Sequence, residues 1–334
     1  MKALVTGANG FAGSHLVRLL LSEGWRILGI TNDIRLNPHL NAASDSFTLE
    51  ESDICDRRRL VPLLREFAPG IVFHLAAVTL KDVSRDSVEE LYRVNLLGTQ
   101  NLLFSILEAK LEPFVIVTGS SASYGALSCS EDRALTEDST PSPETIYGAS
   151  KLAQEIFAAL FGTSTGLKVV RTRAFNHTGP GEGPQMACSS FAKQIAECEM
   201  GKGAVIKVGN LDSHRDYCDV RDVVRAYFLV ATRSRAGEVF NVCSGKAVRM
   251  REIVELLVSM SAKKISVLED SGRFKAAGVS YQRGDYSKIK QTLGWQPEIP
   301  LEKSLSDLLD YWRDRLSEDG ANLGSGSAER RTLE

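Results

Sequence analysis

The stretch Lys2-Ala-Leu-Val-Thr-Gly7-Ala-Asn-Gly10-Phe-Ala-Gly13 decides the fold of this chain. Its apolar start is typical of a buried strand, and glycine then recurs at every third position before a helix that we expect to begin near Phe11. Glycine is needed there because the turn is tight, the backbone must approach a pyrophosphate closely, and the helix must pack tightly on the strand. The helix N-terminus would present free N–H groups and the positive end of its dipole to the phosphates.

Apolar runs and helical patterns alternate along the first half of the chain. Four runs are typical of buried strands, at 2–6, 26–30, 71–75 and 114–118, and a further one follows at 168–172. Helices are expected between them at 60–67, 88–109 and 147–162. This alternation predicts an α/β fold, a Rossmann-like doubly wound parallel sheet. Ligands of such sheets bind beyond the carboxyl ends of the strands, so Gly7, Ala76, Ser120 and Phe175 should meet at one edge.

The second half of the chain has a less regular pattern. A turn-rich segment at 179–184 precedes helical patterns near 190–199, 220–232 and 250–259, a short strand near 205–208, and a last amphipathic helix at 301–316. We therefore expect a dinucleotide-binding domain at 1–172 and a smaller mixed α/β substrate domain at 173–316, some segments of which return to the first domain. Residues 317–334 contain mainly Gly, Ser and charged residues and are expected to form a disordered tail.

Composition excludes several classes of function. The 334 residues are 43% hydrophobic with a formal net charge of -2 and interspersed signs, which argues against nucleic-acid and membrane partners. Neither a charged n-region nor a long apolar run opens the sequence, so a cytoplasmic protein is the expectation. The six cysteines form no Cys-x-x-Cys pair and have no histidine at ligand spacing, so no metal site is predicted.

Tyr147 and Lys151 are the candidate catalytic pair. On a helix, a spacing of four residues places both side chains on one face. An ammonium beside a phenol favours the phenolate, so the pair predicts a tyrosine with a lowered pKa that exchanges a proton with an alcohol oxygen. The same spacing recurs at Tyr286 and Lys290, but only the first pair follows the glycine-rich opening.

Several short motifs occur in order along residues 1–316. They are Gly7-x-x-Gly-x-x-Gly13, Asp53-Ile54, His74-Leu-Ala-Ala77, Asn95 before Gly98-Thr99, Ser120-Ser121 and Tyr147-x-x-x-Lys151. Together they resemble the extended short-chain dehydrogenase/reductase family that acts on nucleotide sugars. In the second half, Arg173-Ala-Phe-Asn-His-Thr-Gly-Pro-Gly181 and Arg215-Asp-Tyr resemble the branch of that family that handles GDP-6-deoxyhexoses.

The resemblance implies roles for individual residues. The catalytic residues would be Ser120, Tyr147 and Lys151, of which Tyr147 and Lys151 also belong to the cofactor site. The other implied cofactor contacts are Gly7, Gly10, Phe11 and Ala12 at the pyrophosphate, Asp53 and Ile54 at the adenine, and Leu75, Ala76 and Ala77 at the phosphate and ribose. The implied substrate contacts are Ser120, Ser121, Asn176, Lys193 and Arg215, where the two cations match a diphosphate.

Ala122 bears on the reaction. Dehydratases of this family place a glutamate there, just after the catalytic Ser or Thr, for the elimination step, and alanine can neither donate nor accept a proton. The remaining trio is sufficient to move one hydride and one proton, which favours a 4-keto reductase acting on a GDP-4-keto-6-deoxyhexose. A 4-epimerase or 4,6-dehydratase of the same family is the alternative, and a non-enzymatic nucleotide-sugar sensor or scaffold is the alternative from another class.

The end of the second predicted strand bears on the choice of cofactor. Thr31 stands where an acidic residue would bind both ribose hydroxyls of NAD, and Asn32 stands where an arginine would bind a 2′-phosphate. Only Arg35 lies nearby. We therefore expect NADP(H), with NAD(H) as the other possibility. The resemblance further implies a homodimer formed through the helices at 88–109 and 147–162.

Overall fold

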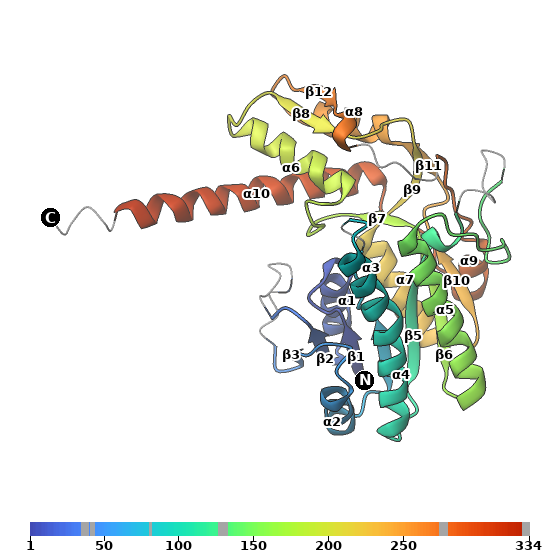
Figure 1. Cartoon of the computed structure of the whole chain (residues 1–334). Helices are drawn as coiled ribbons and strands as arrows, with labels where there is room; N and C mark the ends of the chain where they lie inside the picture. The colour runs from blue at the N-terminus through green and yellow to red at the C-terminus, as the bar shows by residue number, and fades with distance from the viewer. Residues whose placement is uncertain (35–39, 41–43, 80–81, 126–132, 274–279, 329–334) are drawn as a thin grey trace. The chain divides into compact units, whose positions relative to one another are not determined.

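A computed structural model describes residues 1–34, 40, 44–79, 82–125, 133–273 and 280–328 of the chain (Figure 1). Its central feature is a seven-stranded sheet in the order β10-β6-β5-β4-β1-β2-β3. All the strand pairs recorded within this sheet are parallel. The strands are β1 (Lys2–Thr6), β2 (Arg26–Thr31), β3 (Phe47–Glu51), β4 (Ile71–His74), β5 (Phe114–Ser120), β6 (Val169–Ala174) and β10 (Val239–Val242).

Helices cover both faces of this sheet. Successive side chains of a strand point to opposite faces, so neighbouring residues of one strand pack against different helices. The helices of this part are α1 (Phe11–Ser22), α2 (Arg57–Phe67), α3 (Arg85–Tyr92), α4 (Thr99–Glu108), α5 (Ile146–Thr165), α7 (Val220–Arg233) and α9 (Ser287–Leu293). Ala3 and Val5 of β1 belong to a buried cluster with residues of α1 and α7, whereas Leu4 belongs to a second cluster with residues of α2, α4 and α5. The predicted Rossmann-like, doubly wound fold is confirmed.

The chain divides into two compact units. The first comprises Met1–His177, Arg215–Ala247 and Ala277–Glu298, and the second comprises Thr178–His214, Val248–Ala276 and Ile299–Glu334. The first unit extends past residue 172 because β6 runs to Ala174. The second unit contains α6 (Ala187–Glu199), β8 (Val205–Val208), α8 (Met250–Ser259), β12 (Ser266–Glu269), the 3₁₀ turn η4 (Ser271–Arg273) and α10 (Leu301–Ala328). Three further strands, β7 (Asn176–Thr178), β9 (His214–Asp219) and β11 (Ala247–Arg249), form a sheet in the order β11-β9-β7.

Two predicted helices have different limits in the structure. The helix expected at 88–109 is interrupted by a π-helical segment, η2 (Arg93–Gly98), between α3 and α4. Such segments often occur at functional sites, and this one contains Asn95. The last helix does not end at residue 316, because α10 continues to Ala328 through a stretch that has no proline to stop it. Among the described residues, no helix is both long enough and apolar enough to cross a membrane.

Candidate active site

The glycine-rich turn has the geometry that a pyrophosphate requires. Gly7 has a φ of +69°, and a Cβ on it would lie 2.9 Å from the backbone nitrogen of Ala76, so only glycine fits. Helix α1 begins at Phe11, its N-cap Gly10 makes no side-chain cap, and its first turn has no acidic residue. The first backbone N–H groups of the helix, including that of Ala12, therefore suit a phosphate.

The end of β2 is closed by a local hydrogen-bonded turn. Thr31, 6% exposed, donates its hydroxyl to the backbone oxygen of Asp33 at 3.0 Å and accepts from its N–H at 3.2 Å. Asn9 of the glycine-rich turn donates to the same Asp33 oxygen at 2.8 Å. Asn32 is exposed. Of the pair predicted to face the cofactor ribose, Asn32 therefore presents its side chain outward, whereas Thr31 supports the turn. Arg35 lies outside the described residues.

Asp53 and Ile54 follow β3. One carboxylate oxygen of Asp53 accepts from the N–H of Cys55 at 2.8 Å, and the other pairs with Arg93 at 2.8 Å. Burial raises the pKa of Asp53, but these bonds outweigh it and hold the pKa below its usual value. Ile54 is buried against Gly98 of η2. This turn is thus fixed to the π-helical segment, a connection that sequence alone does not indicate.

A buried polar chain holds the backbone after β4, where Leu75, Ala76 and Ala77 lie half-buried or exposed. The N–H of Ala76 donates to the hydroxyl of Thr6, which bonds His74 at 2.8 Å. The other ring nitrogen of His74 bonds Thr99 at 2.8 Å. Burial, with the charge of Lys151 as a second cause, lowers the pKa of His74 to about 3. The ring is therefore neutral and serves as a fixed bridge between strand and helix.

Ser120 and Tyr147 meet at the end of β5. The Tyr147 phenol is hydrogen-bonded to the Ser120 side chain, and the Ser120 hydroxyl also accepts from the N–H of Ala122 at 3.1 Å. Thr145 caps α5 by accepting from the N–H of Gly148. A Cβ at Gly148 would lie only 2.3 Å from the carbonyl oxygen of Ala122. The missing side chain lets the first turn of α5 sit directly on the Ser120 loop.

Lys151 is buried, with 2% of its surface exposed, and its ammonium donates to the carbonyl of Thr118 on β5 at 2.7 Å. Burial lowers its pKa to about 7, and the nearby carboxylate of Glu155 opposes that shift. The expectation that this ammonium lowers the pKa of Tyr147 is wrong. Burial raises the pKa of Tyr147, and the opposing influence is the Ser120 hydrogen bond. The desolvation of both groups could not be read from their spacing.

Ser121 is held by a residue that the sequence analysis missed. Its hydroxyl donates to the side-chain oxygen of Gln282 at 3.1 Å, and the Gln282 amide donates to the Ser121 carbonyl at 3.1 Å. Both residues are buried, and 161 positions separate them. No local pattern signals a contact at that separation. The Ser121 hydroxyl therefore braces the loop, and its contact with substrate remains a prediction.

The other predicted substrate contacts are divided between the units. Asn176 and Arg215 belong to the first unit, and Asn176 donates to the backbone oxygen of Asp216 at 3.5 Å. Burial lowers the pKa of Arg215. Lys193, on α6 of the second unit, pairs with Glu197 at 2.5 Å and lies over the ring of Trp312. A diphosphate would have to compete with Glu197 for Lys193.

His177 is a further residue that was not predicted for the site. Its ring stacks on Phe11, with centroids 5.7 Å apart and an interplanar angle of 12°. Burial lowers its pKa, so the ring tends to stay neutral. His177 directly follows Asn176, the residue of this motif for which a substrate contact is predicted. Over the described part of the chain, no group of His, Cys, Asp and Glu side chains could hold a metal ion.

Comparisons with known proteins fit this geometry. A family model described as GDP-mannose 4,6 dehydratase matches residues 4–308. GDP-6-deoxy-D-mannose reductase of Pseudomonas aeruginosa is 33% identical over 324 residues, which cover 95% of this chain and 99% of that protein. The chain belongs to this family.

Solved structures of similar proteins have the same fold. The structure of RMD from Pseudomonas aeruginosa complexed with NADPH superposes with a TM-score of 0.80 at 30% identity, covering 94% of this chain and 99% of that one. The UDP-glucose 4-epimerase of Thermotoga maritima with UDP-glucose gives a TM-score of 0.83 at 26% identity, covering 95% and 100%. The resemblance to extended short-chain dehydrogenases/reductases of nucleotide sugars is confirmed.

The burial of Lys151 predicts how the free energy of unfolding depends on pH. Its pKa is about 7 in the folded chain against a reference value of 10.5, so above pH 7 the unfolded chain binds more protons at this residue. The free energy of unfolding should therefore rise with pH between about pH 7 and pH 9 through this group. Urea unfolding at a series of pH values should give a smaller rise for Lys151→Met. The exposed Lys168→Met should keep the wild-type slope, and equal slopes in all three proteins would contradict the prediction.

Proposed function

We propose that this chain reduces the C4 ketone of a GDP-4-keto-6-deoxyhexose with NAD(P)H and forms a GDP-rhamnose-type product. The observation that carries the proposal is Ala122, which stands beside Ser120 and Tyr147 in the position of the family's dehydratase glutamate. Its N–H donates to Ser120 and its carbonyl faces Gly148. An apolar methyl group there leaves the trio able to transfer a hydride and a proton but not to eliminate water.

Two carboxylates of the first unit are hydrogen-bonded to groups away from Ser120 and Tyr147. Glu155 accepts from the guanidinium of Arg173 at 2.7 Å, and Glu137 accepts from the backbone N–H of Asn241 at 2.7 Å. Neither is available as the acid or base of an elimination. Glu131 and Asp132, which follow the Ser120 loop in the sequence, lie outside the described residues. The 33% identity to a GDP-6-deoxy-D-mannose reductase supports the same reaction.

Tyr147 is the proton donor in this mechanism. Burial raises its pKa, so it is a neutral phenol at neutral pH, which is the form that can protonate a developing alkoxide. Ser120, already hydrogen-bonded to Tyr147, donates to the same substrate oxygen. Lys151 lies one turn further along α5, where it fixes that helix to β5 through the Thr118 carbonyl and serves the cofactor rather than the tyrosine. The bound reduced nicotinamide supplies the hydride.

Residues of the first unit fit the cofactor. The turn of Gly7 and Gly10 and the first N–H groups of α1 hold the pyrophosphate, and the backbone fixed by His74 lines the phosphate and ribose. Asp53 and Ile54 border the adenine, and Lys151 reaches the nicotinamide ribose. NADP(H) is the favoured cofactor, because neither Thr31 nor Asn32 carries the acidic group that would repel a 2′-phosphate. Asn176 and Arg215 of the same unit hold the sugar nucleotide.

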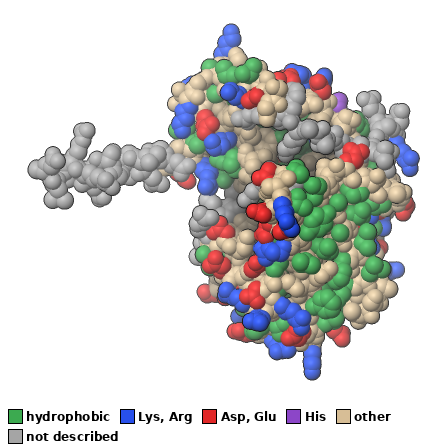
Figure 2. Space-filling model, in the orientation of Figure 1, with side chains coloured by type: hydrophobic (Ala, Val, Ile, Leu, Met, Phe, Trp, Pro, Cys, Tyr) green, Lys and Arg blue, Asp and Glu red, His purple; other side chains and the backbone are tan. Residues whose placement is uncertain are grey.

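The functional form is a homodimer in this proposal. Apolar side chains of α4 and α5 are exposed: Phe104 is 47%, Ile156 50% and Leu160 63% exposed. The two helices pack side by side, and hydrophobic side chains gather over them on the face shown in Figure 2. A patch of this kind is typical of an association surface. A second copy of the chain presenting the same helices would cover it.

Tyr147→Phe removes the proton donor and keeps the ring. We expect kcat to fall by about 100-fold or more, the range that general acid catalysis contributes. The Kd for NADPH, measured by fluorescence titration, should stay within about 2-fold, because the phenyl ring preserves the packing. Tyr286→Phe, in the other Tyr-x-x-x-Lys pair, is the matched control and should keep wild-type turnover. Full activity of Tyr147→Phe would rule out the assigned donor.

Asn32→Asp tests the cofactor preference. A carboxylate at the exposed end of β2 repels a 2′-phosphate, so the KM for NADPH should rise about 10-fold while that for NADH stays nearly constant. Asn32→Ser, which adds no charge, should leave both constants unchanged. Wild-type KM should be lower for NADPH than for NADH. A wild-type preference for NADH would contradict the choice of cofactor.

Leu160→Glu places a charge in the apolar patch of α4 and α5. Burying an unpaired carboxylate in an interface costs several kcal/mol, so the variant should sediment as a monomer where the wild type sediments as a dimer. Val83→Glu, at a residue 79% exposed, adds the same charge outside the patch and should remain dimeric. A Leu160→Glu protein that sediments like the wild type would place the interface elsewhere.

A further inference from the structure

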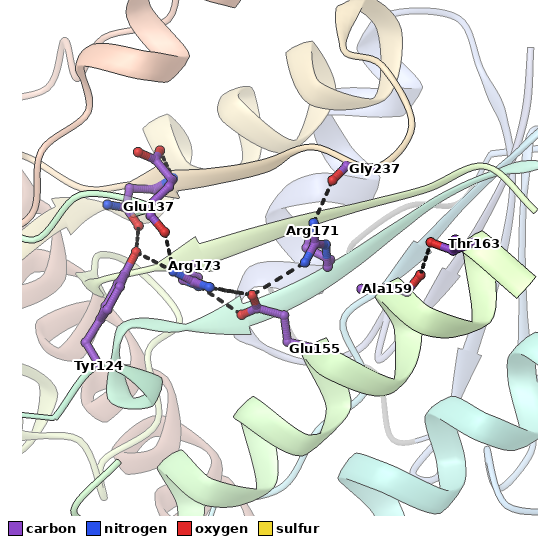
Figure 3. A network of polar contacts seen from close by, with 9 residues as sticks. Tyr124, Glu137, Glu155, Ala159, Thr163, Arg171, Arg173 and Gly237 are labelled. Carbon is purple, nitrogen blue, oxygen red and sulfur yellow. Dashed lines mark hydrogen bonds and ion pairs between the residues drawn. The ribbon is translucent and has the colours of Figure 1, made fainter. Parts of the chain in front are cut away.

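Arg173 is a buried arginine close to the Ser120 loop and α5. It lies on β6 and is 6% exposed. Its Nε and Nη2 bond the carboxylate of Glu155 at distances between 2.7 and 3.1 Å. Its Nη1 donates to the Tyr124 hydroxyl at 2.9 Å and to the backbone oxygen of Glu137 at 3.1 Å (Figure 3). The guanidinium also lies 4.7 Å from the centroid of the Tyr124 ring.

The two side-chain partners of Arg173 lie on the two segments that carry the catalytic trio. Tyr124 directly follows the 3₁₀ turn η3 (Ser121–Ser123), which begins after Ser120, and its N–H donates to the Ser121 carbonyl. Glu155 lies on α5, one turn beyond Lys151 and two turns beyond Tyr147. One guanidinium therefore connects the serine loop to the helix that carries the tyrosine and the lysine.

The connection is rigid because each contact is buried and specific. An arginine that binds a carboxylate through two nitrogens fixes both position and angle, which a lysine cannot reproduce. Tyr124 is fully buried and donates its hydroxyl to Asn241 at 2.7 Å. The hydroxyl thus both accepts from Arg173 and donates to Asn241, so it has little freedom to move.

The same arrangement sets the charges around Lys151. Glu155 is the carboxylate on its own helix, His74 faces it from β4 as a neutral ring, and the Thr118 carbonyl of β5 accepts a hydrogen bond from its ammonium. Arg173 occupies both oxygens of Glu155, while Arg171 of β6 approaches one of them at 3.8 Å. Loss of Arg173 would leave Glu155 free to turn, and its influence on the Lys151 ammonium would change with it.

We propose that Arg173 is a positioning residue for the reduction, which it serves by joining the Ser120 loop, through Tyr124, to α5, through Glu155. The expected effect of Arg173 on turnover rests on the proposed function. The link that it makes between the Ser120 loop and α5 does not. A shift of the serine relative to the tyrosine lowers turnover, because both must reach one substrate oxygen, whereas the nucleotide turn at Gly7 is untouched.

The test compares three variants of the full chain. Tyr124→Phe removes only the hydroxyl that links the loop to Arg173, and it leaves no buried charge unpaired. Arg173→Met removes the whole connection. Arg225→Met is the matched control, because Arg225 also binds a buried carboxylate, Asp222 at 2.7 Å, and lies over an aromatic ring, that of Trp295. Arg225 is on α7, which belongs to the buried cluster on the other face of the sheet.

Turnover should fall about 10-fold in Tyr124→Phe and about 100-fold in Arg173→Met, with the KM for NADPH within about 2-fold of the wild type. Arg173→Lys should recover part of the loss. Arg225→Met should lower the melting temperature and leave kcat unchanged. Wild-type kcat in Tyr124→Phe and Arg173→Met would overturn the proposal, and Tyr124→Phe decides alone if Arg173→Met does not fold.

Hydrogen–deuterium exchange distinguishes a failure of this proposal from a failure of the proposed function. Amides of peptides spanning 117–125 and 146–158 should exchange faster in Tyr124→Phe than in the wild type, and those of Arg225→Met should not. This readout needs no substrate. If the wild type failed to oxidise NADPH with a GDP-4-keto-6-deoxyhexose, the proposed function would fall while faster exchange would still support the connection. Unchanged exchange in these peptides would overturn the connection itself.

Discussion

Both faces of the seven-stranded parallel sheet are covered by helices, so a ligand can reach its backbone only where the strands end. β1 ends at the glycine-rich turn, β4 at the Leu75–Ala77 backbone, and β5 at Ser120. Because all three strands run in the same direction, these ends share one edge, and the parallel sheet itself brings the glycine-rich turn close to Ser120. The close approach of Gly7 to Ala76 follows from adjacent strands ending in register.

The same burial determines the protonation states in the site. Desolvation disfavours whichever form is charged, so it raises the pKa of Tyr147 and lowers those of Lys151 and His74. A neutral phenol suits the reductive direction, in which the site must give a proton. The lysine, with a pKa near neutrality, is poised to change its charge when anionic groups approach it. Lys151 donates to the Thr118 carbonyl and Tyr147 is hydrogen-bonded to Ser120, and these two bonds hold the side chains before substrate arrives.

The features of this site that depend on a local pattern could be predicted from the sequence. The glycine spacing, the apolar strands and the pair on α5 are each confined to a few neighbouring residues, and periodicity is enough to place them. It missed β3 and β10, which are short strands at the two edges of the sheet with weak patterns of their own. It also gave the wrong sign for the pKa shift of Tyr147, because a helical spacing carries no information about desolvation.

Contacts between distant segments could not be predicted for a related reason. Gln282 reaches Ser121 across 161 residues, and Arg173 reaches Tyr124 across 49. Each pair is defined by how strands and loops stack, and no single sequence records that stacking. These are the contacts that fix the loop on which Ser120 and Ala122 stand. Reductases, epimerases and dehydratases are all found among the relatives with this fold, so the fold alone does not decide the reaction. Ala122 is held between Ser120 and the close-packed first turn of α5 and has no group that exchanges a proton, which is why we propose that Tyr147 donates the proton in a reduction.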